Sequence, residues 1–174
     1  MTSLIIVAVV VVVVIIAILA LVAGKAQPEQ AAAFPYDRRK FLLTAAERSL
    51  FGVLERAVQA DYYIFTKVRV ADLLYVKKGT EKRQGHQNRV NSKHIDFVLC
   101  DRAAMSPVLA IELDDSSHEA VERQERDLFL DSAFAAADLP LLHVKARRSY
   151  DVSEVAKEIA AVVSAGTGRV GTGR

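Results

Sequence analysis

The sequence is almost without cysteine, since Cys100 is the only one among its 174 residues. A single cysteine excludes an intrachain disulfide and any zinc site built from several cysteines. Cys100 follows Phe97, Val98 and Leu99 in a strand-like run, so we expect it to fill the core and not to act as a nucleophile. Proteins held together by disulfides or by cysteine-bound zinc are therefore excluded as classes.

The chain also lacks a strong net charge. Its 23 basic and 21 acidic residues leave a formal charge of +2 at pH 7, which is too small to indicate a nucleic-acid partner by itself. The position of the charges is more informative, because no Lys or Arg precedes residue 25. The first residues, MTSL, therefore lack the basic segment with which a signal peptide begins.

Residues 4–23 form an apolar run that contains no charge, glycine or proline. About 20 such residues can cross a bilayer as a helix, so we expect a transmembrane helix over residues 4–23, with a cleaved signal peptide as the competing interpretation. Lys25, Arg38, Arg39 and Lys40 follow the run and favour the cytoplasmic side for the remainder. The expected location is the bacterial inner membrane, crossed once, with a soluble domain in the cytoplasm.

Composition divides the rest of the chain into three parts. Residues 24–40 mix Gly, Pro, Gln and charges without periodicity and are expected to form a linker. Residues 41–164 alternate helical and strand patterns and are expected to form one folded domain. Residues 165–174 are Gly-rich and basic, and the motif GTGR repeats at their end, so we expect a disordered tail.

Periodicity within the domain predicts the order helix, three strands, helix, strand, helix. The first helix begins with a capping box, in which Thr44 is the N-cap and Glu47 lies three residues further on. The last strand can return beside the preceding hairpin only through the intervening helix, so the predicted fold is α/β, with a mixed β-sheet flanked by helices. The strands are expected at 62–76, with a break near residue 71 left open, and at 94–100, 108–114 and 139–146; the later helices are expected at 119–137 and 151–165.

Acidic side chains end an apolar run in the second hairpin strand. If Cys100 faces Val108, then Asp96 lies opposite Glu112. Like charges placed opposite each other destabilise a sheet unless a cation lies between them, and carboxylate oxygens suit Mg²⁺ or Mn²⁺. We therefore predict a divalent-metal site here. The alternative is a register shifted by one residue that turns both acids to solvent, but the apolar alternation of both strands favours the first register.

Residues 94–101 read HIDFVLCD and residues 110–118 read AIELDDSSH. Together with Glu47, RQERD and LPLLHV, these motifs resemble the PD-(D/E)XK superfamily of restriction-endonuclease-like proteins, and specifically the bacterial domain of unknown function 2726; they are also similar to the very-short-patch-repair endonucleases. The resemblance covers roughly residues 40–160. It implies that Asp96 and Glu112 bind the metal, that Glu47 approaches the same site, and that a metal-activated water hydrolyses a DNA phosphodiester bond.

The chain departs from the superfamily pattern at one position. A lysine is expected two residues after the second acid, and Asp114 stands there instead, which puts catalysis in doubt. His118 follows shortly after and could act as the general base, although an exposed loop residue or a helix cap would explain it equally well. His143 and Lys145 share a face of the last strand and could point inward or lie at the sheet edge.

A basic segment precedes the hairpin, between Lys77 and Lys93. We expect it to be a mobile loop that contacts a phosphate backbone, with anionic lipid headgroups as the alternative. No aromatic residue interleaves its charges, so base stacking is not indicated there. The predicted nucleic-acid contacts are Lys82, Arg83, Arg89, Lys93 and, on the long helix, Arg126.

Three of the candidate residues also have simpler explanations. Glu47 suits a capping box whether or not a metal binds. Arg126 suits a solvated helix face, where it lies four residues after Glu122. Lys93 could do no more than neutralise the hairpin.

Two functions follow from these patterns. The first is a membrane-anchored nuclease dependent on Mg²⁺ or Mn²⁺, with DNA as its partner and Asp96, Glu112, Asp114 and His118 as candidate catalytic residues. The second is a catalytically inactive nuclease fold that binds nucleic acid or a protein at the membrane. The missing lysine favours the second, and the cluster of acids favours the first.

Overall fold

The structure is a computed structural model, and it describes residues 2–23, 34–58, 60–114 and 120–167. The side chains of residues 2, 4, 22, 23, 120–125 and 167 lie outside this description. The chain divides into two compact units, Met1–Lys40 and Phe41–Arg174.

The first unit contains helix α1 (Thr2–Ala23). Within the described residues, no helix combines the length and the apolar character that crossing a membrane requires. This finding contradicts the transmembrane helix predicted over residues 4–23.

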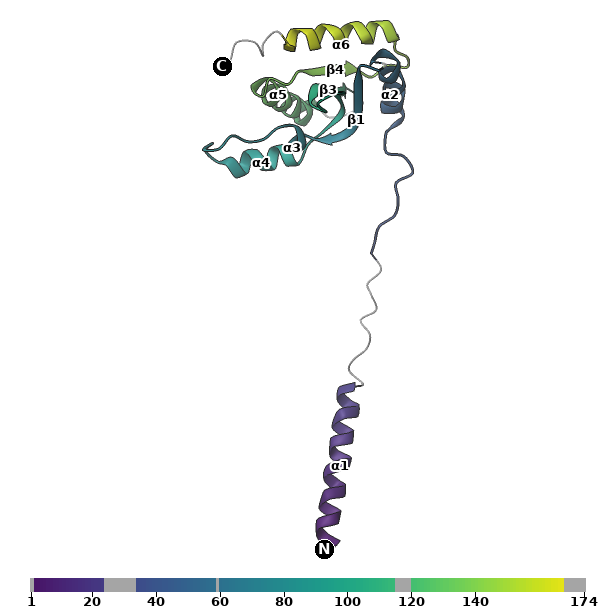
Figure 1. Cartoon of the computed structure of the whole chain (residues 1–174), viewed down its shortest axis with the longest axis vertical. Coiled ribbons are helices and arrows are strands. Elements are labelled where there is room, and N and C mark those ends of the chain that lie inside the picture. The colour runs from purple at the N-terminus through teal and green to yellow at the C-terminus, as the bar shows by residue number, and fades with distance from the viewer. Residues whose placement is uncertain (1, 24–33, 59, 115–119, 168–174) are drawn as a thin grey trace. The chain divides into compact units, whose positions relative to one another are not determined.

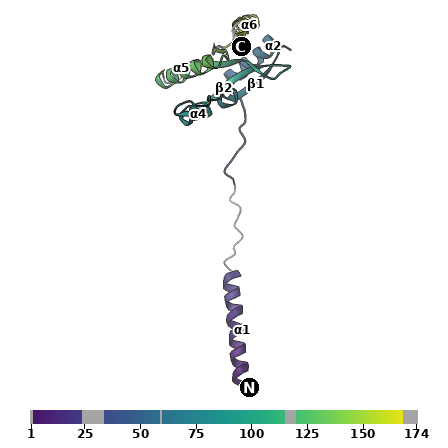
Figure 2. The same cartoon turned by 60° about the vertical axis from the view of Figure 1, so that its left-hand side comes forward.

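The second unit is built around a four-stranded sheet in the order β1-β2-β3-β4 (Figures 1 and 2). β1 (Tyr62–Arg69), β2 (His94–Asp101) and β3 (Pro107–Asp114) are successive antiparallel neighbours, whereas β4 (Leu141–Lys145) runs parallel to β3. A parallel neighbour requires a crossover, which α5 (Ala120–Ala136) supplies. The predicted α/β fold, a mixed sheet flanked by helices, is confirmed.

The hairpin of β2 and β3 has the predicted register in the part that carries Asp96 and Glu112. Phe97 faces Ile111, and the next two pairs continue in step. The register then shifts at Cys100, which pairs with Pro107 and not with Val108. The turn explains this bulge, because Asp101 Oδ1 accepts hydrogen bonds from two turn N–H groups and so draws the strand end inward.

Helices cover both faces of the sheet, as Figure 1 shows with α6 on one side and α3 and α4 on the other. On one face, α2 (Ala45–Val58) and α6 (Val152–Thr167) bury Phe97, Leu99 and Ile111. On the other face, α5 packs Phe134 against the sheet, together with α3 (Val70–Leu73) and α4 (Arg83–Asn91). Burying each such side chain stabilises the fold by about 1.5–3 kcal/mol.

The first strand is shorter than the apolar pattern over residues 62–76 predicts. It ends at Arg69, and α3 follows because Val70 turns fully into the core while its N–H donates to the carbonyl of Lys93 at 2.9 Å. The predicted break near residue 71 therefore lies at the start of this short helix.

The basic segment expected to be a loop contains α4. Glutamine and asparagine pairs four residues apart stabilise this helix: Gln84 donates to Asn88 at 2.8 Å and Gln87 to Asn91 at 3.0 Å. Val90 anchors the helix by burial in the core. A single buried apolar side chain gives too little periodicity for a sequence pattern to reveal the helix.

Helix α6 continues through Thr167, so residues 165–167 are helical and not part of a tail. It begins after Asp151, whose Oδ1 accepts a hydrogen bond from the N–H of Glu154 at 2.9 Å. Gly166 packs so closely on Pro140 that a Cβ would lie 2.8 Å from its Cγ. The rest of the predicted tail lies outside the described residues.

Candidate metal centre

Most of the candidate site residues meet in one cleft of about 500 Å³. We call it the acidic cleft. Strands β1, β2 and β3 form it, and α2 and α5 each bring side chains to it. Its lining is Glu47, Lys67, Ser92, Lys93, His94, Asp96, Glu112, Leu113, Asp114, Arg126 and Asp127.

Asp96 and Glu112 lie side by side on the neighbouring strands β2 and β3. The two carboxyl groups are close enough for each to influence the pKa of the other. Asp96 Oδ2 also accepts the N–H of Leu113 at 3.0 Å, which fixes its orientation. The pairing predicted from strand alternation is therefore present.

Burial and the neighbouring charge of Asp96 raise the pKa of Glu112 to about 8, although Arg126 opposes the shift. Only 5% of the Glu112 side chain is exposed, whereas Arg126, whose Nη2 lies 3.0 Å from Glu112 Oε1, is 47% exposed. Water screens the guanidinium, so its ion pair only partly offsets the desolvation of the acid. At neutral pH the carboxyl group of Glu112 is therefore mostly protonated.

Asp96 differs from Glu112 because a cation reaches it directly. Burial alone would raise the pKa of Asp96, but hydrogen bonds from Lys67 and from the Leu113 N–H outweigh burial and lower it. Of the two acids, Asp96 thus carries the negative charge and Glu112 the proton.

Lys67 is the site residue that the sequence reasoning missed. Its Nζ lies 2.6 Å from Glu47 Oε1 and 2.8 Å from Asp96 Oδ1. Burial lowers the pKa of Lys67, but the two carboxylate partners raise it further, so the ammonium stays charged. Its backbone has φ 55°, a left-handed conformation that a non-glycine residue rarely adopts and that is enriched at functional sites.

A signal for Lys67 was present in the sequence. It is the only charged residue between Asp61 and Arg69, within a stretch of aromatic and β-branched residues. Alternation could not assign it a face, because the left-handed residue interrupts the regular pleat.

Glu47 serves both functions considered for it. Its Oε2 accepts the N–H of Thr44 at 2.9 Å, and its own N–H donates to Thr44 Oγ1 at 3.2 Å, which is the predicted capping box. Its Oε1 binds Lys67 instead. The helix cap thus fixes a carboxylate that in turn holds the lysine beside Asp96.

Asp114 lies at the rim of the acidic cleft and contacts the last strand. His143 Nδ1 is 3.1 Å from Asp114 Oδ1, and His143 Nε2 is 3.1 Å from Asp131 Oδ1 on α5. Burial lowers the pKa of His143, but the two carboxylates raise it overall. His118, the proposed general base, lies outside the described residues.

The donor set of the acid pair fits one divalent cation. Mg²⁺ usually keeps several waters and needs only one or two carboxylates from the protein. Asp96 and Glu112 supply two ligands of this type. In the part of the chain that the structure describes, no three His, Cys, Asp or Glu side chains are arranged to hold a metal ion. Glu47, predicted as a third ligand, binds Lys67 instead.

The predicted nucleic-acid contacts divide into two groups. Lys93 and Arg126 line the acidic cleft itself. Lys82, Arg83 and Arg89 are exposed at or on α4. The structure therefore places two of the five beside the acids and three on the neighbouring helix.

Comparison with known proteins gives a family and no function. No curated protein matches the chain, and no solved structure matches it. The family described as protein of unknown function, DUF2726, matches residues 39–162, which include every strand and the whole acidic cleft. The chain therefore belongs to the DUF2726 family.

Proposed function

We propose that residues 41–164 form a divalent-metal-dependent nuclease that hydrolyses phosphodiester bonds of DNA. The observation that carries the proposal is the pair of acids Asp96 and Glu112 on neighbouring strands, which line one cleft together with the ammonium of Lys67. The resemblance of this hairpin to PD-(D/E)XK enzymes supports the same reaction class.

Asp96 and Glu112 would bind Mg²⁺ or Mn²⁺ through their oxygens. The ion would stabilise negative charge on the phosphate and lower the pKa of a bound water. Binding would require Glu112 to lose its proton, because only the carboxylate is a ligand. Because the bound cation would neutralise the Glu112 carboxylate, Arg126 would be attracted less strongly to it and would become available to a phosphate oxygen.

In this proposal, Lys67 supplies the positive charge that the superfamily pattern expects from a lysine at position 114. It reaches the acidic cleft from β1, on the opposite side of β2 from β3, which carries Asp114. An ammonium held within hydrogen-bonding distance of Asp96 is placed to orient an attacking water or a phosphate oxygen beside the acid pair. Glu47 would act as a positioning residue through its contact with Lys67.

The second candidate function is that of a nuclease fold that binds nucleic acid or a protein without cutting. One observation favours it: the acids are already neutralised, Asp96 and Glu47 by Lys67 and Glu112 by its proton and Arg126. Such a site is electrostatically satisfied without a metal.

Cleavage of plasmid and branched DNA by the full chain with Mn²⁺ or Mg²⁺ separates the two candidates. The nuclease proposal predicts cutting that needs the metal and that both Asp96→Asn and Glu112→Gln abolish. Glu158→Gln is the matched control, because Glu158 is an exposed acid on α6. Cutting that persists in both site variants contradicts the proposal, and metal-insensitive DNA binding without cutting supports the second candidate.

A further inference from the structure

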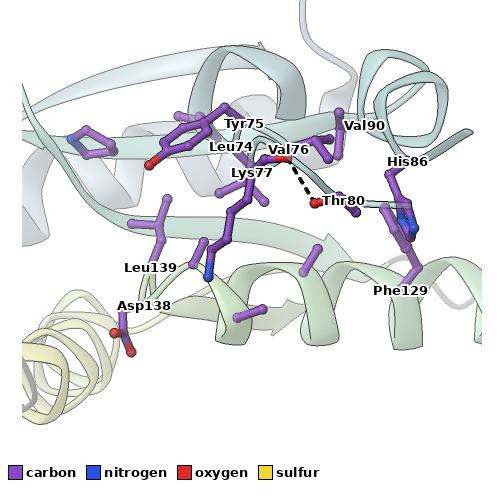
Figure 3. Close-up of a pocket in the computed structure, with 15 residues that line it drawn as sticks. Leu74, Tyr75, Val76, Lys77, Thr80, His86, Val90, Phe129, Asp138 and Leu139 are labelled. Atoms are coloured by element: carbon purple, nitrogen blue, oxygen red, sulfur yellow. Dashed lines mark hydrogen bonds between the residues drawn. The ribbon is translucent and has the colours of Figure 1, made fainter. Parts of the chain in front are cut away.

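A second, larger hollow lies beside the acidic cleft. It is a groove of about 670 Å³ between the segment 73–80, α4 and α5, and Figure 3 shows the side chains that line it. Its floor is apolar and includes Leu74, Val90 and Phe129. A volume of this size and an apolar floor are typical of sites that bind a small organic group.

Aromatic and cationic side chains stand at the edges of this α4–α5 groove. Tyr75 is 86% exposed and presents its ring to solvent, while His86 and Phe129 lie at the opposite end (Figure 3). Lys77 extends across the groove between them (Figure 3). Among the described lining residues, Asp138 is the only acid.

Helix α5 lines both the groove and the acidic cleft. Lys93 lines the cleft, yet its Nζ lies 5.5 Å from the ring centre of Phe129, which lines the groove. Arg89 stacks on the same ring at 4.2 Å. Two cations therefore lie at Phe129, between the groove and the acids, where a phosphate backbone running from one to the other would pass.

The separation of the two sites can be expressed in nucleotides. Asp127 lines the cleft, and Ala133 lies near the middle of the part of α5 that lines the groove, between Phe129 and Ala136. At 1.5 Å per residue, they are roughly 9 Å apart along α5. A stacked strand advances about 3.4 Å per nucleotide, so the groove lies roughly three nucleotides from a phosphate in the cleft.

We infer that the α4–α5 groove binds unpaired bases of a nucleic-acid strand whose backbone continues past Arg89 and Lys93 into the acidic cleft; the direction of that continuation rests on the proposed function. Exposed aromatic rings beside cations are what single-strand binding requires, because every base offers a face for stacking. The preferred substrate is then DNA with a single-stranded extension and not a blunt duplex.

Charge favours nucleic acid over an apolar peptide as the occupant. Lys77 lines the groove, and Lys82, Arg83 and Arg89 lie at or on α4, the helix that forms one of its walls. None of these four has an ion-pair partner among the described residues. An apolar peptide would leave these charges uncompensated, whereas phosphates compensate them.

Fluorescence anisotropy of the full chain in EDTA tests the inference without requiring catalysis. Labelled DNA hairpins carry 5′ or 3′ extensions of zero to six nucleotides. We expect affinity to rise about tenfold once one polarity of extension reaches roughly three nucleotides, in line with one well-stacked base. Equal affinity for blunt and extended hairpins overturns the inference.

Variants locate the effect in the groove. Tyr75→Ala and the groove-filling Ala136→Trp should both reduce binding of the extended hairpin to that of the blunt one, and Tyr75→Phe should retain it. Tyr36→Ala is the matched control, because Tyr36 is 81% exposed and lies outside the domain. Unchanged binding in both Tyr75→Ala and Ala136→Trp overturns the inference and leaves the groove to another occupant, such as a peptide.

Together with the cleavage assay described above, repeated on the blunt and extended hairpins with Mn²⁺, this binding experiment separates the inference from the proposed function. Extension-dependent binding without metal-dependent cutting upholds the groove and contradicts the nuclease. Cutting of blunt DNA without any preference for an extension upholds the nuclease and contradicts the groove.

Discussion

At the scale of single residues, the centre of the acidic cleft sets three carboxyl groups, those of Glu47, Asp96 and Glu112, against two cations and a proton. Lys67 holds Glu47 and Asp96, while Arg126 and a proton offset Glu112. Removing one member of such a network leaves its partners with uncompensated charge in a partly desolvated place. Substitutions at different members of the network should therefore change the folding stability, and its response to Mg²⁺ and pH, in different directions.

Lys67→Met should destabilise the metal-free protein by about 1–3 kcal/mol, because two partly buried carboxylates lose a charged hydrogen-bond donor. Millimolar Mg²⁺ should then raise the unfolding temperature more than in the unsubstituted protein, since a cation replaces the missing charge. Thermal unfolding with and without Mg²⁺ measures both effects. Lys157→Met, on α6, is the control and should change neither; an Mg²⁺ response smaller than that of the unsubstituted protein would contradict the prediction.

Glu112→Gln should change how stability depends on pH. The folded-state pKa of Glu112 is about 8, above its usual value of 4.5, so the folded state keeps a proton that the unfolded state loses. Its contribution is full below about pH 4.5 and is lost as the pH rises to about 8. The metal-free Gln variant, which cannot ionise, should lose less stability between pH 5 and pH 8.

Denaturant unfolding at several pH values measures this difference. Asp96 does not contribute to the change in stability between pH 5 and pH 8, because its pKa is lowered. Its contribution to stability is lost only as the pH falls through that lowered value. Parallel pH profiles for the two proteins between pH 5 and pH 8 would show that Glu112 titrates normally.

At the scale of elements, the N-terminal cap of helix α2 is directly connected to the acidic cleft. Glu47 binds Thr44 through one oxygen and Lys67 through the other. The helix start and the position of the lysine are thus fixed by the same side chain. A cap that also serves a site can be tested by removing only the capping partner.

Thr44→Ala should cost about 1 kcal/mol of folding stability through loss of the N-cap. The contact between Glu47 and Lys67 does not involve Thr44, so DNA cleavage and the Mg²⁺ response should stay within a few-fold of the unsubstituted values. Glu47→Gln provides the contrast, because it weakens the contact with Lys67 and should reduce both. A loss of cleavage in Thr44→Ala as large as in Glu47→Gln would show that the Thr44 side-chain cap and the site are coupled.

The strands and helices also show which features of the fold and the site could be predicted from sequence patterns. Alternation along β2 and β3 predicts that Asp96 faces Glu112, because one register buries both apolar faces. It does not reveal Lys67, whose left-handed backbone breaks the alternation, nor α4, which side-chain amide pairs and Val90 hold in place. The length of the apolar run over residues 4–23 led to a membrane span that the described part of α1 does not bear out. Local patterns therefore predicted the acid pair but not the cation beside it.

At the scale of the whole domain, the site lies where both layers of helices meet the sheet. Glu47 reaches the acidic cleft from α2 on one face, and Arg126 reaches it from α5, which covers the other. The core around α6 lies away from this cleft, and Ile159 is 4% exposed there. Stability and the site can therefore be changed separately.

Ile159→Ala should lower the free energy of unfolding by about 2–5 kcal/mol, because it leaves a cavity between α6 and the sheet. The folded fraction should keep the Mg²⁺ response and the DNA affinity of the unsubstituted protein. Denaturant unfolding and anisotropy measure the two quantities independently. Loss of DNA affinity under conditions where the variant remains folded would mean that the α6 core is coupled to the site.

The central claim, that Asp96 and Glu112 bind a divalent metal, is tested most directly by locating Mn²⁺ through its anomalous scattering in crystals of the full chain. A metal centre predicts one peak at coordination distance from both carboxyl groups, and no peak there in Glu112→Gln crystals grown under the same conditions. Crystals in which Lys67 and Arg126 still contact the two acids, with Mn²⁺ bound elsewhere or nowhere, would contradict the claim and leave a fold whose acids need no metal.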